Sequence, residues 1–395
     1  MRLYRVPAVG MTHGVGNIVG SLIDLLIKKK TEIEPDLFGC RYIYDFCSGK
    51  AALVIALRAL SRLEESRCEV VLPAYTCYSV AAAVEAAGLK LVLCDVVPET
   101  LDFDYEMLAS VANGNTLCIV ATHFFGKSAD VTRIREVADD VGAFLVEDAA
   151  QSGIDIDQEQ MFSDITVYSF ARGKPLSTNG GGILAVNHKN ISSEIALFHG
   201  KLSVPGPFQE LKSAFMMLIS DILIHPSVFW LPAALPFLGI GETVYPNHVF
   251  VGKMGRLRLF LLHKLVRKIV VLSELRQTNA AFYSDQLERN DTVQLLAFPQ
   301  NRGHAPIRFP CYLRESADLS ERRKAVSAQE LGISQMYPHG LHQLEQIKPF
   351  FLNYNDSFPG ADFISDHLIT LPTHPLVGEQ ARTQVLAWLD GVVRG

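Results

Sequence analysis

The feature that most constrains the fold is a regular alternation of short apolar runs with helix-like segments between residues 70 and 187. The runs are rich in β-branched residues and lack the polar alternation of strands that face water on one side. This pattern predicts strands that are buried on both faces of a mostly parallel sheet, with helices covering the sheet. The predicted strands are Val70–Pro73, Lys90–Val96, Thr116–Phe125, Ala143–Asp148, Ile165–Ala171 and Gly181–Asn187, with helices at Tyr78–Ala87 and Asp130–Val141 between the earlier ones.

The last third of the chain has a different pattern, and 395 residues are too many for one small core. Strands are predicted at Ala305–Arg314, Gln335–Pro338 and Leu368–Leu371, and helices at Ser320–Leu331 and Glu379–Leu389. We therefore predict an α/β protein with two domains. Residues 1–250 would form the large domain, and residues 251–395 a linking helix and a small α+β domain.

Composition excludes several functional classes. The 36 Lys and Arg against 42 Asp and Glu argue against nucleic acid as a partner. The seven cysteines include no C-x-x-C pair, so neither a disulfide framework nor a zinc site is indicated, and a cytoplasmic protein is expected. No metal is expected at a group of late histidines either, because no carboxylate or cysteine falls at ligand spacing with His339, His342, His367 and His374.

The amino-terminal segment is apolar but does not resemble a secretory signal. Its basic residues Lys28–Lys30 follow the apolar stretch, and Asp24 interrupts that stretch. We expect a helix over about Val15–Lys30 that docks on the body of the protein.

Ser48 and Gly49 open a predicted helix that continues through Ala51–Leu60. The free N–H groups at a helix N-terminus, together with the helix dipole, make a phosphate site, and glycine lets the anion come close. Ser-Gly is also an ordinary helix start, so this motif alone does not decide between the two readings.

Asp148 stands at the end of a predicted apolar strand, beside Glu147 and close to Gln151. A carboxylate in this position can pair with a protonated pyridine nitrogen and make that ring an electron sink. Alternatively, Asp148 caps the helix that follows.

Lys174 lies between two predicted buried strands and is followed by a glycine-rich turn, Gly180–Gly182. An internal lysine amine can form a Schiff base with an aldehyde cofactor and then transfer protons as a general base. Most lysines are solvated surface residues, which is the alternative here.

The ordered set of motifs resembles the DegT/DnrJ/StrS nucleotide-sugar aminotransferases, which are pyridoxal-5′-phosphate (PLP) enzymes of the aspartate-aminotransferase-like fold. The motifs are S-G-x-A-A-L at 48–53, V-x-x-P-x-Y-T at 70–76, T-H-F-F-G-K-x-A-D at 122–130, V-E-D-A-A-Q at 146–151 and Y-S-F-x-x-x-K at 168–174. Residues 336–342 and 371–375 resemble the late motifs of that family. The resemblance implies a seven-stranded sheet in the large domain and a homodimer.

The resemblance also implies a role for each matching residue. Lys174 would form the Schiff base with PLP, Asp148 would pair with the ring nitrogen, and Gln151 would lie near the phenolic oxygen. Ser169 and the backbone around Ser48, Gly49 and Lys50 would bind the phosphate. His123 would line the pocket, either touching the cofactor or as a buried histidine that does not, and Cys77 stands where the family usually has an aromatic residue stacked on the ring.

The implied function is PLP-dependent transfer of an amino group, from glutamate by resemblance, to a keto sugar carried on a nucleotide or a lipid, as in polysaccharide biosynthesis. Lysine at position 174 favours amino transfer over the related dehydration, in which histidine replaces it. Departures from the family pattern at Lys50, Cys77 and Asn179 leave two alternatives. One is an enzyme of the same fold acting on an amino acid or lipid intermediate, and the other is a homologue that binds PLP or a sugar without turnover.

An apolar segment over Ser213–Ile240 is unusual for such a protein. It is interrupted by Asp221, His225 and three prolines, so it cannot form the roughly 20-residue apolar helix that spans a bilayer. It could form a helical hairpin buried at a dimer interface, or an apolar surface for peripheral contact with a membrane or a lipid-like substrate.

Overall fold

The structure is a computed structural model that describes residues 4–27, 33–154, 162–235, 239, 241, 243–291, 293–297, 305–314 and 326–394. Its centre is a seven-stranded sheet with the strand order β1-β9-β8-β7-β6-β2-β3. Strand β9 runs antiparallel to both β8 and β1, and the other neighbouring pairs are parallel. The strands are β1 (Tyr42–Phe46), β2 (Glu69–Pro73), β3 (Lys90–Cys94), β6 (Thr116–Thr122), β7 (Phe144–Asp148), β8 (Ile165–Ser169) and β9 (Gly182–Val186).

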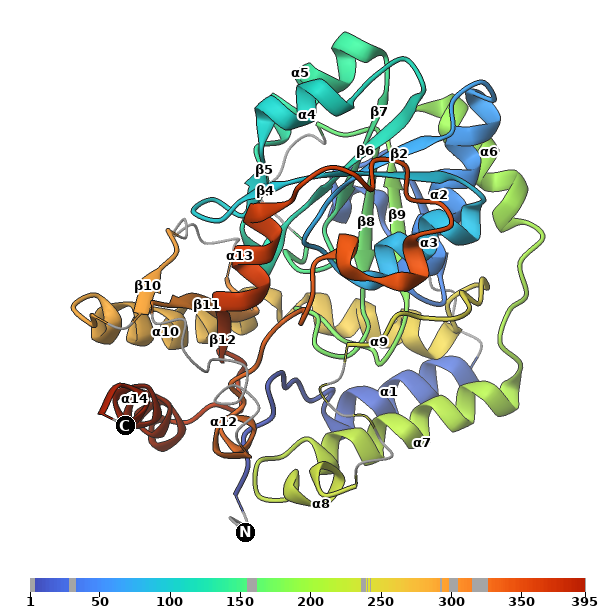
Figure 1. Ribbon diagram of the computed structural model, residues 1–395. Coiled ribbons are helices and arrows are strands. Elements are labelled where there is room, and N and C mark those ends of the chain that lie inside the picture. Colours follow the sequence, from blue (N-terminus) through green and yellow to red (C-terminus); the bar gives the residue numbers. More distant parts are fainter. Residues whose placement is uncertain are drawn as a thin grey trace.

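Helices cover both faces of this sheet (Figure 1). On one face, α2 (Gly49–Leu63), α3 (Tyr78–Ala87) and α6 (Lys189–His199) pack in one apolar core with every strand of the sheet. On the other face, α4 (Tyr105–Val111) and α5 (Val131–Val141) cover the half that contains β3, β6 and β7. The half that contains β8 and β9 packs against α1 (Val15–Leu26), α7 (Pro207–Leu223) and α9 (Arg256–Val266). The predicted fold class is thereby confirmed.

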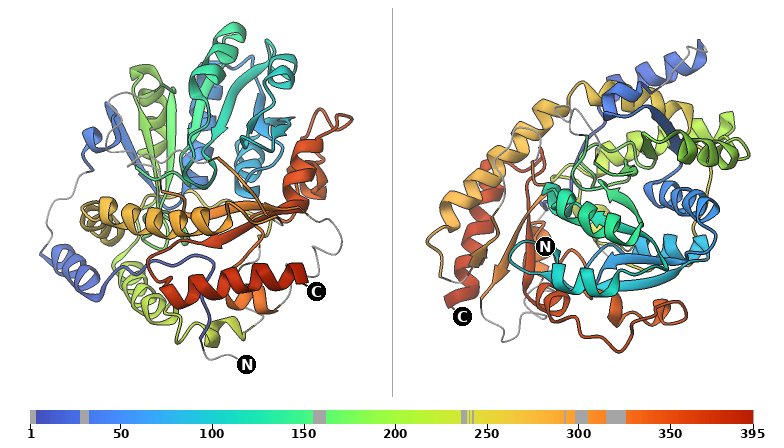
Figure 2. Two further views of the ribbon diagram at one scale, coloured as in Figure 1. Left: turned by 90° about the vertical axis from the view of Figure 1, so that its left-hand side faces the viewer. Right: turned by 90° about the horizontal axis from the view of Figure 1, so that it is seen from above.

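The small domain is an antiparallel sheet, β10-β11-β12, built from Val293–Leu295, Arg308–Leu313 and Leu368–Pro372. It shares an apolar core with α10 (Ile269–Leu287), α12 (Val326–Glu330) and α14 (Glu379–Arg394). Figure 2 shows α10 and α14 alongside this sheet. The remaining elements are the two-residue strands β4 (Val96–Val97) and β5 (Asp102–Phe103), the helices α8 (Trp230–Ala233) and α13 (Pro359–His367), and 3-10 turns at Pro35–Phe38, Phe124–Gly126, Leu341–Gln343 and Glu345–Ile347.

The structure departs from the predicted elements at a few places. The segment Gln335–Pro338 is not a strand, because Tyr337 turns its side chain into the large-domain core and only Ser334 forms a bridge to β12. Strand β1 was not predicted. Residues 320–325 of one predicted helix, and most of 236–240 in the apolar segment, lie outside the described residues. The domain boundary at residue 250 stays a prediction.

The apolar segment and the amino-terminal helix are packed together. Asp221 of α7 accepts the N–H groups of His13 and Gly14 at 2.9 and 2.8 Å, and its Oδ1 lies 2.5 Å from the His13 ring. This acidic residue therefore ties the two residues that precede α1 to α7, and the expected docking of that helix is observed. In the part of the chain that the structure describes, no helix is both long and apolar enough to cross a membrane.

Candidate active site

The N-terminus of α2 lies against the end of β8 and the start of β9. Ser48 is the N-cap, and its hydroxyl accepts the N–H of Ala51 at 3.2 Å. The N–H groups of Gly49 and Lys50 come earlier in the first turn, where a helix supplies no acceptor of its own. A Cβ built on Gly49 would lie 2.8 Å from Cβ of Ser169. The predicted phosphate residues Ser48, Gly49 and Ser169 are thus brought together, with Lys50 partly exposed beside them.

This close approach gives a test of the packing. Replacing Gly49 with alanine should destabilise the protein by about 1–3 kcal/mol, because the new methyl group overlaps Ser169 in a buried contact. Adding Ser169→Gly to the same chain removes that overlap and should restore most of the stability. Chemical denaturation of the single and double variants measures both effects, and equal stability of Gly49→Ala and the wild type would contradict this packing.

Asp148 ends β7 and is buried at the centre of the site. Its Oδ1 accepts the N–H of Ala150 at 3.0 Å, and among the described residues no donor reaches Oδ2. Burial raises the pKa of Asp148, while the positive charge of Lys174 and the hydrogen bond from Ala150 oppose that rise. A buried carboxylate with one oxygen left free fits a ligand that brings its own N–H donor.

Lys174 is half-buried in the connection between β8 and β9, close enough to Asp148 for its charge to act on that carboxylate. Two parts of the chain that are distant in sequence contact the connection between β8 and β9, next to Lys174. The carbonyl of Pro175 accepts a hydrogen bond of 2.9 Å from Arg276 of α10, a buried guanidinium whose pKa burial lowers to about 10. Gly173 has φ +79°, and a Cβ there would lie 3.0 Å from a methyl group of Val9. These contacts fix the backbone on both sides of Lys174.

Gln151 and Tyr337 connect the two domains at the site. The Gln151 amide donates to the Tyr337 hydroxyl at 3.0 Å, and its carbonyl accepts the N–H of Phe125 at 3.1 Å. Burial raises the pKa of Tyr337, and the nearby Cys77 and Asp148 add to the rise. Tyr337 was not predicted as a site residue, although it lies in the late motif at 336–342. Its long-range placement beside Asp148 has no local sequence signal.

Cys77 is the N-cap of α3 and lies 3.0 Å from the hydroxyl of Ser79. The neighbouring rings of Tyr75 and Tyr78 are buried, and their hydroxyl groups bond the backbone of residues 337 and 339. Each hydroxyl both donates to a carbonyl and accepts an N–H, at 3.0–3.3 Å. These tyrosines therefore hold the backbone of residues 337–339 against the large domain, next to the site.

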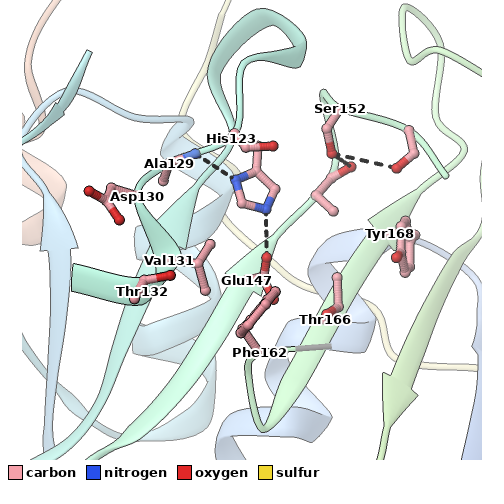
Figure 3. Close-up of a pocket in the computed structure, with 13 residues that line it drawn as sticks. His123, Ala129, Asp130, Val131, Thr132, Glu147, Ser152, Phe162, Thr166 and Tyr168 are labelled. Carbon is pink, nitrogen blue, oxygen red and sulfur yellow. Dashed lines mark hydrogen bonds and ion pairs between the residues drawn. The ribbon is translucent and has the colours of Figure 1, made fainter. Parts of the chain in front are cut away.

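His123 lies close to Asp148 but turns its ring toward the opposite face of the sheet. Its Nδ1 accepts the N–H of Ala129 at 3.1 Å, so Nε2 carries the proton and donates to Glu147 at 2.9 Å. Hydrogen bonding to His123 and to Ser163 lowers the pKa of Glu147 despite the burial of this carboxyl, which by itself would raise it. This pair lines a cavity of about 350 Å³ together with Ser152, Thr166 and Tyr168 (Figure 3). Neither Lys174 nor the start of α2 lines this cavity.

Together these residues offer one anion site at the N-terminus of α2, one buried carboxylate with a free oxygen, and one amine near that carboxylate. A molecule with a phosphate group, a protonated ring nitrogen and an aldehyde fits this set of partners. Among the described residues there is no group of three or more His, Cys, Asp or Glu side chains arranged to hold a metal ion.

Comparison with known proteins finds a match to one protein family over most of the chain. The sequence profile of the DegT/DnrJ/EryC1/StrS aminotransferase family matches residues 35–222 and 240–390. L-glutamine:2-deoxy-scyllo-inosose aminotransferase of Streptomyces kanamyceticus is 33% identical over 138 residues, which are 34% of this chain and 32% of that protein. GDP-perosamine synthase of Vibrio cholerae is 26% identical over 143 residues, 35% of this chain and 38% of that protein. The aligned part is thus about a third of each relative.

Among solved structures, NtdA from Bacillus subtilis, with its bound cofactor PMP, superposes with a TM-score of 0.73 at 18% identity. The superposition covers 100% of this chain and 86% of NtdA. At this identity the likeness concerns the fold alone, and it extends over the whole of this chain.

Proposed function

Because the chain belongs to the DegT/DnrJ/EryC1/StrS aminotransferase family, we propose that it is a PLP-dependent aminotransferase that moves an amino group from an amino acid to a keto sugar. The observation that carries this proposal is the convergence of Lys174, Asp148 and the N-terminus of α2 in one buried site. Motifs that are up to about 120 residues apart in sequence supply these three parts.

The residues assigned to the cofactor divide by chemistry. The N–H groups at the start of α2, with Ser48 and Ser169, would hold the phosphate, since a helix N-terminus attracts an anion. The free oxygen of Asp148 would accept a hydrogen bond from a protonated ring nitrogen. Lys174 would supply the amine that an aldehyde cofactor requires.

The cofactor, when bound, supplies an electron sink for the electrons released at the carbon that loses its proton. Lys174 is the group that removes and returns this proton, because its amine is the basic side chain of the set. Gln151 and Tyr337 orient the site from opposite domains and keep water out of it, since both side chains are buried. A binding protein without turnover would need neither Lys174 nor Asp148.

The substrates are part of this proposal. We assign glutamate as the amino donor and a keto sugar on a nucleotide or lipid carrier as the acceptor. The names of two relatives support the class of acceptor: one is an L-glutamine:2-deoxy-scyllo-inosose aminotransferase and the other a GDP-perosamine synthase. We also assign a cytoplasmic homodimer, as is usual when such a site is shared between subunits.

The visible absorption of the purified protein tests this function. We expect absorbance from bound PLP that is lost when glutamate is added, because the amino group passes to the cofactor, and that returns with a keto sugar acceptor. Glutamine and alanine serve as comparison donors. A protein that keeps its absorbance with every amino acid would instead support an enzyme of the same fold with different chemistry, and a protein that never binds PLP would refute the proposal.

A further inference from the structure

The outer face of α1 is apolar and exposed. Val15, Val19, Ile23, Leu26 and Ile27 have between 43 and 78% of their surface exposed. Their spacing of three and four residues places them on one stripe of the helix, opposite the side that packs on α9. No charged residue among the described positions of α1 is exposed on this stripe, because the single acid, Asp24, is paired with Lys264 at 2.6 Å.

Helices α7 and α8 also expose large apolar side chains. Phe208, Leu211, Phe215, Ile222 and Leu231 are 46–80% exposed. A single exposed charge, Lys212, interrupts them on the described part of α7. Soluble monomers rarely expose so many large apolar side chains together, so the surface indicates a partner.

The two helices form one unit. Asp221 of α7 binds the N–H groups of His13 and Gly14, which precede α1, and the helices pack against each other and against α9. Figure 1 shows α1 and α7 side by side at one end of the molecule. We call the exposed apolar residues of α1, α7 and α8 the apolar platform.

The described charges on α1, on α7 and α8 with their flanking residues, and on α9 are mainly basic, although the whole chain is acidic. Residues 15–27, 201–235 and 253–268 contain eight Lys and Arg against three acids, whereas the chain has a formal net charge of −6. Each of the three acids is turned inward: Asp24 pairs with Lys264, Asp221 with His13, and Glu210 accepts the N–H groups of Arg256 and Leu257. Lys201, Lys212, Arg267 and Lys268 are exposed.

Part of the apolar platform lies outside the residues that the family profile matches. The profile leaves out residues 1–34, which contain α1, and residues 223–239, which contain α8, whereas it includes residues 207–222 of α7. The superposition on NtdA covers 100% of this chain, so these helices belong to the shared fold, and it is their exposed apolar side chains that need a partner.

We propose that the apolar platform docks on the surface of an anionic phospholipid bilayer, with α1 and α7 lying in the plane of the interface. Exposed apolar stripes that are flanked by basic residues and free of exposed acids fit this partner, since the apolar side chains enter the acyl boundary and the lysines meet the headgroups. A second copy of this chain would bring the same basic charges to the contact, so charge complementarity favours the bilayer.

Vesicle flotation of the full-length protein tests this proposal. We expect the wild type to float with vesicles of phosphatidylcholine and phosphatidylglycerol, and high salt or pure phosphatidylcholine to weaken binding. The double variant Leu211→Glu/Phe215→Glu should bind at least about tenfold more weakly, since two apolar anchors are lost. Tyr354→Glu, at a side chain 69% exposed elsewhere, should bind as the wild type does.

Three outcomes would overturn the proposal. The wild type could stay in the aqueous fraction with both kinds of vesicle, or the double variant could float as well as the wild type. Light scattering could also show a wild-type oligomer that the double variant loses without any vesicle binding, and this would identify a second copy as the partner. The visible absorption of each variant reports separately on the proposed function, which flotation does not require.

Discussion

Replacing Lys174 with alanine is expected to lower the rate of amino transfer by about 10³-fold or more, because one side chain both holds the cofactor and moves the proton. Burial raises the pKa of Asp148 and the charge of Lys174 lowers it, so the amine lies close to this buried carboxylate. Stopped-flow absorbance after addition of glutamate measures the loss. The variant should still fold, since Lys174 is half-buried and its described hydrogen bond is made by its backbone.

An exposed lysine provides the control for this prediction. Lys201 is fully on the surface after α6, and Lys201→Ala should leave the rate unchanged. Equal rates for Lys174→Ala and Lys201→Ala would remove Lys174 from the proposed chemistry.

Replacing Asp148 with asparagine is expected to weaken PLP binding by about 10- to 100-fold. A hydrogen bond to a charged group contributes about 1.5–3 kcal/mol, and each 1.4 kcal/mol corresponds to a factor of about ten. Asparagine keeps the shape and the bond from Ala150 but cannot hold a protonated ring nitrogen. Fluorescence titration of cofactor-free protein with PLP measures the affinity.

Asp148→Asn should weaken PLP binding, but it should not destabilise the cofactor-free protein. Burial raises the pKa of Asp148, so its ionised form is disfavoured in the fold. The folded protein then binds more protons than the unfolded chain, and this residue's contribution falls as pH rises through the raised pKa. At neutral pH, cofactor-free Asp148→Asn should therefore be at least as stable as the wild type. The control Asp140→Asn, at an exposed position of α5, should change neither affinity nor stability, and unchanged PLP affinity in Asp148→Asn would contradict the assignment.

The large domain could be predicted from the sequence because its signals are local. Each predicted strand from Val70 to Asn187 is present, since a run of β-branched residues between turns fits few other structures. Strand β1 was missed because Tyr42–Phe46 contains Asp45 and is only partly buried, so it lacks the continuous apolar run of the other strands. The predicted strand at Gln335–Pro338 failed because Tyr337 packs into the other domain, which is a tertiary effect.

The residues of the candidate site that lie in sequence motifs could be predicted, but their long-range contacts could not. Ser48, Gly49, Asp148 and Lys174 lie in motifs whose order along the chain resembles a family, and the structure brings their segments together. The orientation of His123 could not be predicted, because it depends on hydrogen bonds to Ala129 and Glu147. Tyr337 reaches Gln151 across 186 residues of sequence, and no local pattern encodes that contact.

The most direct test of the central claim is to locate the cofactor on the chain. Purified protein incubated with PLP is reduced with borohydride, which fixes the cofactor to the amine that holds it, and is then digested and measured by mass spectrometry. We expect a phosphopyridoxyl group on the peptide that contains Lys174, and its absence after Lys174→Ala. Modification of a different lysine, or of none, would contradict it.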